Sequence, residues 1–240
     1  MDDPTLDRGL HKQALRGLSR VHGWTGTVAC LWPDLVAAYE SKRRRAPGAD
    51  PEPTLRILDV ACGGGDVALG LRGRAAREDW DVVIDGADVS ERAGRPSGKA
   101  GRRAREAGGA IDDVKRLDAV TDPLPGGYDV MMSTLFLHHL SDDDAVTVLR
   151  KMADAAPRVW VSDLRRGKLA YGFTVAGTRL VSRSPVVHKD GPQSVRAGWE
   201  RDELEALALR AGMTPDRGRL QVKSRLPFRL ELRWVRTGDA

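Results

Sequence analysis

The chain has little cysteine and few aromatic residues. Two of its 240 residues are cysteines, Cys30 and Cys62, and Phe, Trp and Tyr together make up 5%. One cysteine falls in a predicted helix and the other in a glycine-rich turn, which argues against a disulfide framework and against a zinc site. Because the rare aromatic residues do not interleave with runs of basic residues, the composition gives no support to a nucleic-acid-binding face.

The chain also lacks a long apolar run and a cationic start. No apolar stretch approaches the roughly 20 residues of a membrane-spanning helix. The opening segment, residues 1–4, is acidic where a secretory signal needs positive charge. We therefore expect a cytoplasmic protein without membrane insertion. The 41% apolar and 30% charged residues are typical of a soluble globular protein, and we interpret the net charge of +5 as a solvated basic surface.

The most informative segment, residues 55–68, predicts a buried strand that turns sharply into a helix. Its apolar run ends around Asp59, and small residues follow, among them Gly63 and Gly65. Glycine permits positive φ and lets a ligand approach the backbone closely. In open α/β sheets, such a turn at the carboxyl end of a strand binds a nucleotide-like cofactor. The segment fits the dinucleotide fingerprint G-x-G-x-x-G/A, and it also fits the pattern D-x-A-x-G-x-G that begins at Asp59.

Strand and helix patterns alternate along the chain from residue 54 onward, which predicts a parallel sheet with crossover helices. Strands are expected at residues 56–60, 82–87, 114–117, 128–133 and 159–162. Helices are expected at residues 67–76, 141–155 and 200–211. Two final strands, at residues 220–222 and 228–235, are predicted to form an antiparallel pair. Upstream, a helix is expected at residues 28–44, with Pro33 delaying its start.

Acidic residues also follow the second and third predicted strands. Asp88 lies about 20 residues beyond the glycines, where a carboxylate can accept hydrogen bonds from both hydroxyls of a ribose. Asp118 ends the third strand, where a carboxylate can accept a bond from an adenine amino group, although an aspartate there is also common as a turn residue. The fourth strand runs into the segment LHHL at residues 137–140.

In this order, these segments resemble the class I S-adenosylmethionine (SAM)-dependent methyltransferases, in particular the subgroup of quinone-biosynthesis and natural-product enzymes. The resemblance is carried by residues 59–65, 86–90, 118–119 and 137–140. It implies an α/β fold: a three-layer, doubly wound, Rossmann-like, seven-stranded sheet with an antiparallel last strand. It further implies an N-terminal helical lid at residues 1–50 and a methyltransferase domain at residues 51–240. An insert at about residues 164–199 would cap the substrate side.

The resemblance also implies how SAM is bound. Asp59 and the glycine turn would pack against its methionine part, Asp88 would hold the ribose hydroxyls, and Asp118 would bind the adenine edge. The residues assigned to the cofactor are Asp59, Ala61, Cys62, Gly63, Gly65, Asp88, Val89, Asp118, Ala119, Ser133, Thr134 and Leu135. Two departures stand out: Ala61 replaces the usual first glycine of the loop, and residues 91–98 are polar and rich in Gly and Pro where the family has an apolar helix start.

The implied reaction transfers a methyl group from SAM to an oxygen or carbon of a small aromatic or hydrophobic acceptor, such as a phenolic polyketide or quinone-like ring. The candidate catalytic bases are His188 and Asp190 in the insert and His139 after the fourth strand. Of the neighbours His138 and His139, one is expected to face the cofactor and the other the core, and two adjacent histidines make a poor metal site. Asp163 is expected either to face the substrate or to pair with a neighbouring arginine.

Three alternatives stay open at this point. An RNA methyltransferase is compatible with the basic charge, although no Pro-Cys nucleophile and no Asn/Asp-Pro-Pro-Tyr/Phe motif follows the fourth strand. An NAD(P)-dependent oxidoreductase fits the glycine fingerprint. A non-catalytic protein with the same fold would bind a partner instead of turning over a substrate. The pattern favours a small-molecule substrate and no metal, and it leaves the oligomeric state open.

Overall fold

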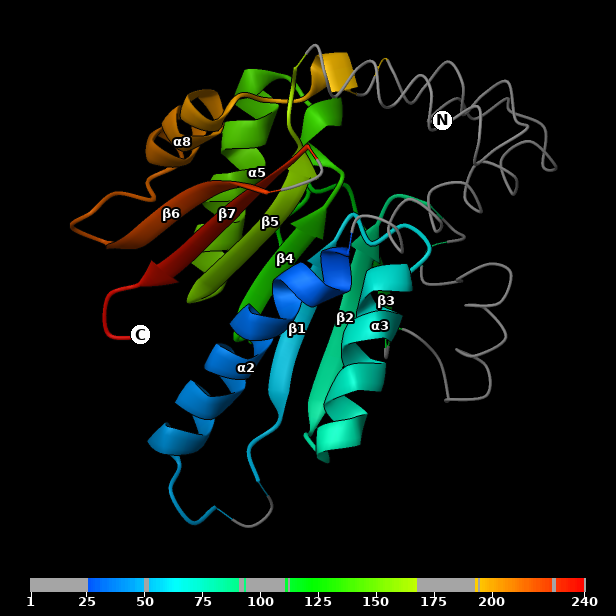
Figure 1. Ribbon diagram of the computed structural model, residues 1–240, viewed down its shortest axis with the longest axis vertical. Coiled ribbons are helices and arrows are strands. Elements are labelled where there is room, and N and C mark those ends of the chain that lie inside the picture. The colour runs from blue at the N-terminus through cyan, green and yellow to red at the C-terminus, as the bar shows by residue number, and fades with distance from the viewer. Residues whose placement is uncertain are drawn as a thin grey trace, which may run out of the picture.

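The computed structural model describes residues 26–49, 52–90, 93, 111, 113–167, 193, 195–225 and 228–239, which form a three-layer α/β structure (Figure 1). At its centre is a seven-stranded sheet in the order β3-β2-β1-β4-β5-β7-β6. The strands are β1 (Leu55–Val60), β2 (Val82–Asp88), β3 (Val114–Arg116), β4 (Val130–Thr134), β5 (Arg158–Leu164), β6 (Gly218–Arg225) and β7 (Arg229–Arg236). Strands β1 to β5 are parallel, whereas β7 is antiparallel to both of its neighbours. This confirms the predicted doubly wound sheet with an antiparallel last strand.

Helices cover both faces of the sheet (Figure 1). One face carries α2 (Thr27–Arg45), α3 (Asp66–Ala75) and the short η1 (Ala76–Glu78). The other carries α5 (Asp142–Ala155) and α8 (Arg201–Arg210), and the single turn η2 (Leu137–His139) follows β4. The helices predicted at residues 67–76, 141–155 and 200–211 are thus confirmed to within a residue at each end.

The two faces have separate apolar clusters because successive side chains of a strand point to opposite sides. In β1, Leu55 and Ile57 pack with α2 and α3, whereas Leu58 and Val60 pack with α5 and α8. Asp59 shares the side of Ile57 and therefore points toward the face that carries α3. The alternation of side chains along each strand thus determines on which face of the sheet each predicted site residue lies.

The prediction that Pro33 delays the upstream helix is wrong, because α2 begins at Thr27 and Pro33 lies inside it. Proline inside a helix costs about 3 kcal/mol. Leu31, Leu35 and Tyr39 of this helix are fully buried, and burial of each such side chain contributes about 1.5–3 kcal/mol. Tertiary packing therefore outweighs the local penalty.

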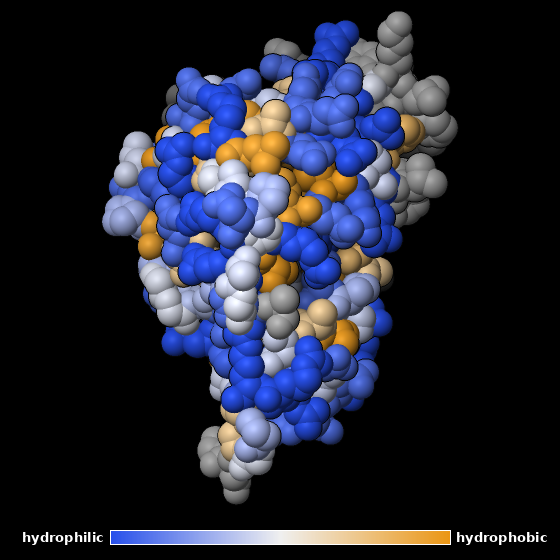
Figure 2. Space-filling model, turned by 90° about the vertical axis from the view of Figure 1, so that its left-hand side faces the viewer, coloured by the Kyte–Doolittle hydropathy of each residue, from blue (hydrophilic) through white to orange (hydrophobic). Residues whose placement is uncertain are grey.

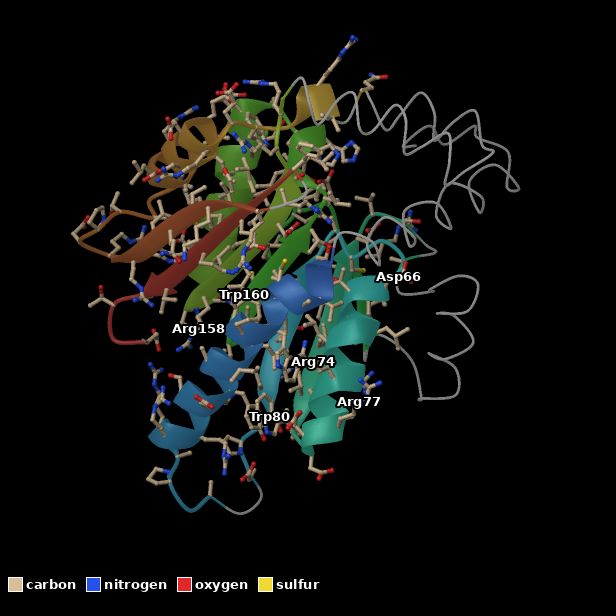
Figure 3. The ribbon with its side chains drawn as sticks, in the orientation of Figure 1. Asp66, Arg74, Arg77, Trp80, Arg158 and Trp160 are labelled. Carbon is tan, nitrogen blue, oxygen red and sulfur yellow. The ribbon has the colours of Figure 1, made fainter. Side chains whose placement is uncertain are left out.

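A stack of aromatic rings holds α2 against the end of α3. The Trp80 ring, labelled in Figure 3, stacks on Tyr39 at a centroid distance of 4.6 Å and on Trp32 at 5.5 Å. The Arg74 guanidinium lies 4.3 Å from the Trp32 ring centroid. This stack lies near the amino ends of the strands. It therefore holds the helical layer of α2 and α3 in place and does not occupy the carboxyl edge of the sheet.

Strand β6 forms the outer edge of the sheet, on a flank that is mostly hydrophilic (Figure 2). Arg219, Lys223 and Arg225 of this strand are exposed. Charged side chains on an edge strand discourage pairing with another chain.

Parts of two predicted regions lie outside the described residues. These parts are residues 1–25 and 50 of the predicted lid and residues 168–192 and 194 of the predicted insert. Within the part that the structure describes, no helix combines the length and the hydrophobicity needed to cross a membrane.

Candidate functional site

The carboxyl ends of β1, β2 and β4 meet at one edge of the sheet. Val60 at the end of β1 lies opposite Ala87 of β2 and Ser133 of β4. The chain then turns through Ala61 (φ 57°), Gly63 (φ 53°) and Gly65 (φ 73°) into α3. These left-handed conformations suit the two glycines, whereas they cost roughly 1 kcal/mol or more at Ala61. The alanine that departs from the family pattern is therefore accommodated with backbone strain.

The glycine turn lies unusually close to β2, and Gly86 makes this possible. The backbone N–H of Cys62 donates to the Ala87 carbonyl at 3.2 Å. A Cβ atom at Gly86 would lie 2.7 Å from Cys62 Sγ and 2.9 Å from Ile111 Cδ1, closer than side-chain carbons normally approach. Gly86 was not among the predicted site residues, although a glycine inside a strand pattern often marks such a close approach.

Asp59 is a buried carboxyl group beneath the glycine turn. It is 1% exposed, and its Oδ1 has no hydrogen-bond partner among the described residues. Burial, together with the neighbouring negative charge of Asp88, raises the pKa of Asp59 to about 8. A carboxylate in such a place needs a proton or a cationic partner. Asp59 is therefore a group that a positively charged ligand would satisfy.

Asp88 ties the end of β2 to the glycine turn. Its Oδ2 accepts a hydrogen bond from the Gly63 N–H at 2.9 Å, and its Oδ1 accepts one from the Ser90 N–H at 2.8 Å. Each carboxylate oxygen can accept more than one bond, so these contacts orient the group and leave it able to accept others. The next side chain, Val89, is 60% exposed at the same edge.

Asp118 lies in a tight turn two residues beyond β3. Its Oδ1 accepts a bond from the Val120 N–H at 2.8 Å, and its own N–H donates to Asp122 Oδ2 at 2.8 Å. The Leu117 N–H donates to the Asp88 carbonyl at 3.2 Å, which links this turn to the end of β2. The structure thus brings Asp59, Asp88 and Asp118 to the same sheet edge, and Asp118 also has the turn role weighed from the sequence.

At the end of β4, the three predicted residues have different surroundings. Ser133 is buried, and its Oγ donates to the Val60 carbonyl at 2.9 Å. Thr134 is half-buried, and Leu135 is half-buried with a φ of 55°. The Ser133 hydroxyl is therefore engaged in joining β4 to β1, while Thr134 and Leu135 are more accessible.

The two histidines after β4 differ sharply in exposure. His138 is buried, and its Nδ1 lies 2.6 Å from Asp163 Oδ1. His139 is exposed, and the centroids of the two imidazole rings are 4.1 Å apart. This confirms that one of the pair faces the core, and it identifies that residue as His138.

Asp163 is completely buried at the end of β5. It accepts two further bonds, from the backbone N–H groups of His138 (3.2 Å) and Leu164 (2.6 Å). Burial raises the pKa of Asp163, but the His138 charge and these hydrogen bonds outweigh burial and hold the pKa below its usual value. Asp163 therefore pairs with His138 in the core, and the positive charge of Arg229 also lowers the pKa of Asp163.

Two of the candidate catalytic bases, His188 and Asp190, lie outside the described residues. Within those residues, no cluster of three or more potential metal ligands occurs. A cavity of about 560 Å³ lies between α2 and β1, lined by residues such as Arg43, Gly48 and Pro53. It is at the amino ends of the strands and therefore on the opposite edge from the three acids.

Comparison of the sequence and the structure with known proteins identifies proteins similar to this chain. No protein-family model matches the chain. It is 30% identical over 128 residues to a ubiquinone biosynthesis O-methyltransferase of Dechloromonas aromatica, a match that covers 52% of this chain and 51% of that protein. A protein of the same name from Bordetella bronchiseptica is 30% identical over 164 residues, with 67% of this chain and 62% of the relative covered.

A solved structure extends the likeness to nearly the whole chain. Magnesium protoporphyrin IX methyltransferase from Synechocystis, solved with bound SAM, superposes with a TM-score of 0.53 at 18% sequence identity, covering 97% of this chain and 86% of the other. The chain has the fold of the class I SAM-dependent methyltransferases. It spans about half the length of two of the curated methyltransferases that it matches. In this methyltransferase fold, the edge that carries Asp59, Asp88 and Asp118 is the carboxyl edge at which ligands bind.

Proposed function

We propose that the protein is a SAM-dependent methyltransferase acting on an oxygen or carbon of a small, aromatic or hydrophobic acceptor. The observation that carries this proposal is the buried Asp59 carboxyl, whose Oδ1 lacks a partner among the described residues beside a glycine turn. The names of the sequence relatives, ubiquinone biosynthesis O-methyltransferases, support a phenolic oxygen on a quinone-like ring as the acceptor.

The charge at the glycine turn favours SAM over a dinucleotide. A dinucleotide places an anionic diphosphate at the start of the following helix. Here that place is acidic: Asp59 lies beneath the turn, Asp88 accepts the Gly63 N–H, and Asp66 opens α3 (Figure 3). The Asp66 carboxylate in the first turn of α3 repels a diphosphate. Asp59 would lose its proton in favour of an ammonium group, which SAM carries and a diphosphate does not. Asp59 and Asp66 therefore count against the oxidoreductase alternative.

The residues present fit the three parts of SAM. Asp59 would face the ammonium group, and the glycine turn would leave room for the methionine part. Asp88, already oriented by two backbone N–H groups, would accept bonds from the ribose hydroxyls. Asp118, with Ala119 packed behind it, would accept a bond from the adenine amino group. The bound sulfonium would supply an activated methyl group.

The task left to the chain is to align the acceptor, to exclude water and to take a proton from the acceptor. Alignment of reacting groups can lower a barrier by roughly 7–11 kcal/mol. Among the described candidates we assign the base to His139, because it is exposed at the end of β4, whereas His138 is buried on Asp163. His188 and Asp190 remain proposed bases from the insert. We further propose that residues 1–50 and 164–199 cover the cofactor and the acceptor, respectively.

Calorimetry with S-adenosylhomocysteine (SAH), SAM, NAD⁺ and NADP⁺ tests the cofactor. We expect SAM and SAH to bind and both dinucleotides to show no heat of binding. Binding of a dinucleotide without binding of SAH would overturn the proposal. A screen for methyl transfer from SAM to phenols and quinols then tests the acceptor class.

The base assignment has its own test. We expect His139→Gln to lower kcat by about 10²-fold or more while leaving the SAH affinity unchanged. An unchanged kcat in His139→Gln would move the assignment to His188 or Asp190, which the corresponding Gln and Asn variants would then identify.

A further inference from the structure

The side-chain ammonium of Lys151 closes the turn that carries Asp118. Lys151 lies in α5, on the face of the sheet opposite α2 and α3. Its Nζ contacts the backbone oxygens of Ala119 at 3.3 Å, Val120 at 2.6 Å and Asp122 at 2.8 Å. An ammonium group has three N–H donors. Each donor therefore has a carbonyl acceptor in one short turn, about 30 residues away in the sequence.

These bonds reinforce a turn that is already closed on itself. The Asp122 N–H donates to the Asp118 carbonyl at 2.8 Å, and Asp122 Oδ2 accepts the Asp118 N–H at 2.8 Å. Ala119 in the middle of the turn is 6% exposed and packs in the core beside α5. The turn is therefore held by Lys151 on one side and by core packing beneath it. It presents its side chains in a single conformation.

The carboxylate of Asp118 is fixed by this turn through one oxygen. Its Oδ1 accepts the Val120 N–H at 2.8 Å, whereas its Oδ2 accepts no hydrogen bond from the described residues. The Val120 N–H belongs to the same peptide group as the Ala119 carbonyl, which Lys151 Nζ contacts at 3.3 Å, and the next carbonyl, that of Val120, forms the shortest contact of Nζ. The lysine therefore restrains the peptide group that orients the carboxylate and the peptide group after it.

We propose that Lys151 is a positioning residue for adenine recognition: by clamping the carbonyls of Ala119, Val120 and Asp122, it holds the Asp118 carboxylate ready to accept the adenine amino group. This inference rests on the SAM site proposed above. A preoriented acceptor binds its donor more tightly because no ordering is needed at the moment of binding. Lys151 itself touches no part of the ligand and acts through the turn.

The test compares two ligands that differ at the adenine amino group. S-inosylhomocysteine has a carbonyl oxygen where SAH has the amino group, so it offers no donor at that position to Asp118. We expect the wild type to bind SAH at least tenfold more tightly than S-inosylhomocysteine. We expect Lys151→Met, which keeps most of the side-chain length and removes the donors, to weaken SAH about tenfold and S-inosylhomocysteine by less than about twofold. The matched control is Lys223→Met on the exposed β6, which should change neither affinity.

The outcomes separate this inference from the proposed function. If the wild type does not bind SAH, the proposed SAM site is wrong, and the inference fails with it. If the wild type binds SAH and Lys151→Met keeps the ratio of the two affinities, only the inference is overturned. An equal loss of both ligands also overturns it, because a merely structural role weakens both alike.

A second variant tests the inference if Lys151→Met does not fold. Lys151→Arg keeps the positive charge but replaces the three tetrahedral donors with a planar fork. We expect it to lower the ratio of the SAH and S-inosylhomocysteine affinities, and an unchanged ratio would overturn the inference. In an Asp118→Ala background, the Lys151→Arg substitution should no longer affect the ratio, since the carboxylate that it positions is absent.

Discussion

Replacing Asp59 by asparagine is predicted to abolish a pH dependence of cofactor binding. The carboxyl group is fully buried beside Asp88, and its pKa is raised to about 8. Below pH 8 the unliganded protein therefore holds this group mostly protonated and neutral. A ligand that brings an ammonium group to Asp59 favours the carboxylate, so binding must release a proton.

The size of the effect follows from the population of the ionised form. With a pKa of about 8, roughly one-tenth of the molecules carry the carboxylate at pH 7 and roughly one-hundredth at pH 6, and the apparent affinity falls by the same factor. The affinity for SAH should thus rise about tenfold for each pH unit between pH 5.5 and 7.5. Close to one proton should be released for each ligand bound.

Calorimetry at pH 5.5, 6.5 and 7.5, in two buffers of different ionisation enthalpy, measures both quantities. Asp59→Asn should bind SAH with an affinity that no longer changes in this range, and without proton release. Asp79→Asn is the matched control, because Asp79 is exposed directly after η1, far from the glycine turn. A wild type with equal affinity at pH 5.5 and 7.5 would refute the reasoning, as would a pH dependence that survives in Asp59→Asn.

The same substitution has a consequence for stability. The unfolded chain loses the Asp59 proton near the ordinary value of 3.8, whereas the folded chain keeps it to about pH 8. The unfolded state therefore binds fewer protons between these values, and the free energy of unfolding falls as pH rises through them. At pH 7 this amounts to about 4 kcal/mol, which an uncharged asparagine avoids. We expect Asp59→Asn to be more stable than the wild type without ligand, as measured by urea unfolding at pH 7.

Three further predictions concern the same edge of the sheet. Gly86→Ala places a Cβ 2.7 Å from Cys62 Sγ, so we expect a loss of about 1–3 kcal/mol in urea unfolding and weaker SAH binding; Gly73→Ala, which meets no atom within 4 Å, should instead be neutral or stabilising. Ala61→Gly relieves a φ of 57° and should raise stability by up to about 1 kcal/mol after the entropy of the unfolded glycine is counted; a lower urea midpoint would contradict this. The pKa of Asp163 is lowered in the folded state. The contribution of this carboxylate to stability is therefore complete above its ordinary pKa of 3.8 and is lost as the pH falls through the lowered pKa. We expect Asp163→Asn to lose less stability than the wild type between pH 5 and 2.

The sequence predicted those features that depend on local pattern. Most strands of the sheet were recognisable from their apolar runs, although β6 extends well beyond the predicted residues 220–222. The sharp turn at Gly63 and Gly65 was recognisable from the need for positive φ, which both residues adopt. The location of Asp59, Asp88 and Asp118 at one edge followed from topology, because parallel strands end on the same side. Local periodicity and strand direction were therefore sufficient for the outline of the site.

Features that depend on contacts between distant segments could not be predicted in this way. Asp163 pairs with His138 across 25 residues, and Lys151 reaches the Val120 carbonyl across 31 residues. In the sequence, Lys151 is one of many charged residues on a helix, and nothing in its spacing indicates three carbonyl partners. Pro33 illustrates the opposite error. The local rule that proline disrupts a helix was applied there, but the burial of α2 against the sheet determines where the helix begins.

Backbone strain and a buried acid both lie at the edge where the cofactor would bind. Ala61 and Leu135 have positive φ, and each such conformation costs roughly 1 kcal/mol or more at a non-glycine residue. The protonation of buried Asp59 adds a larger cost. Unfavourable terms of this kind persist where the rest of the fold determines the conformation, and they cluster at binding sites. A cationic ligand on Asp59 would remove the largest of them, so the stability of the folded protein and its occupancy by SAM are coupled through one carboxyl group.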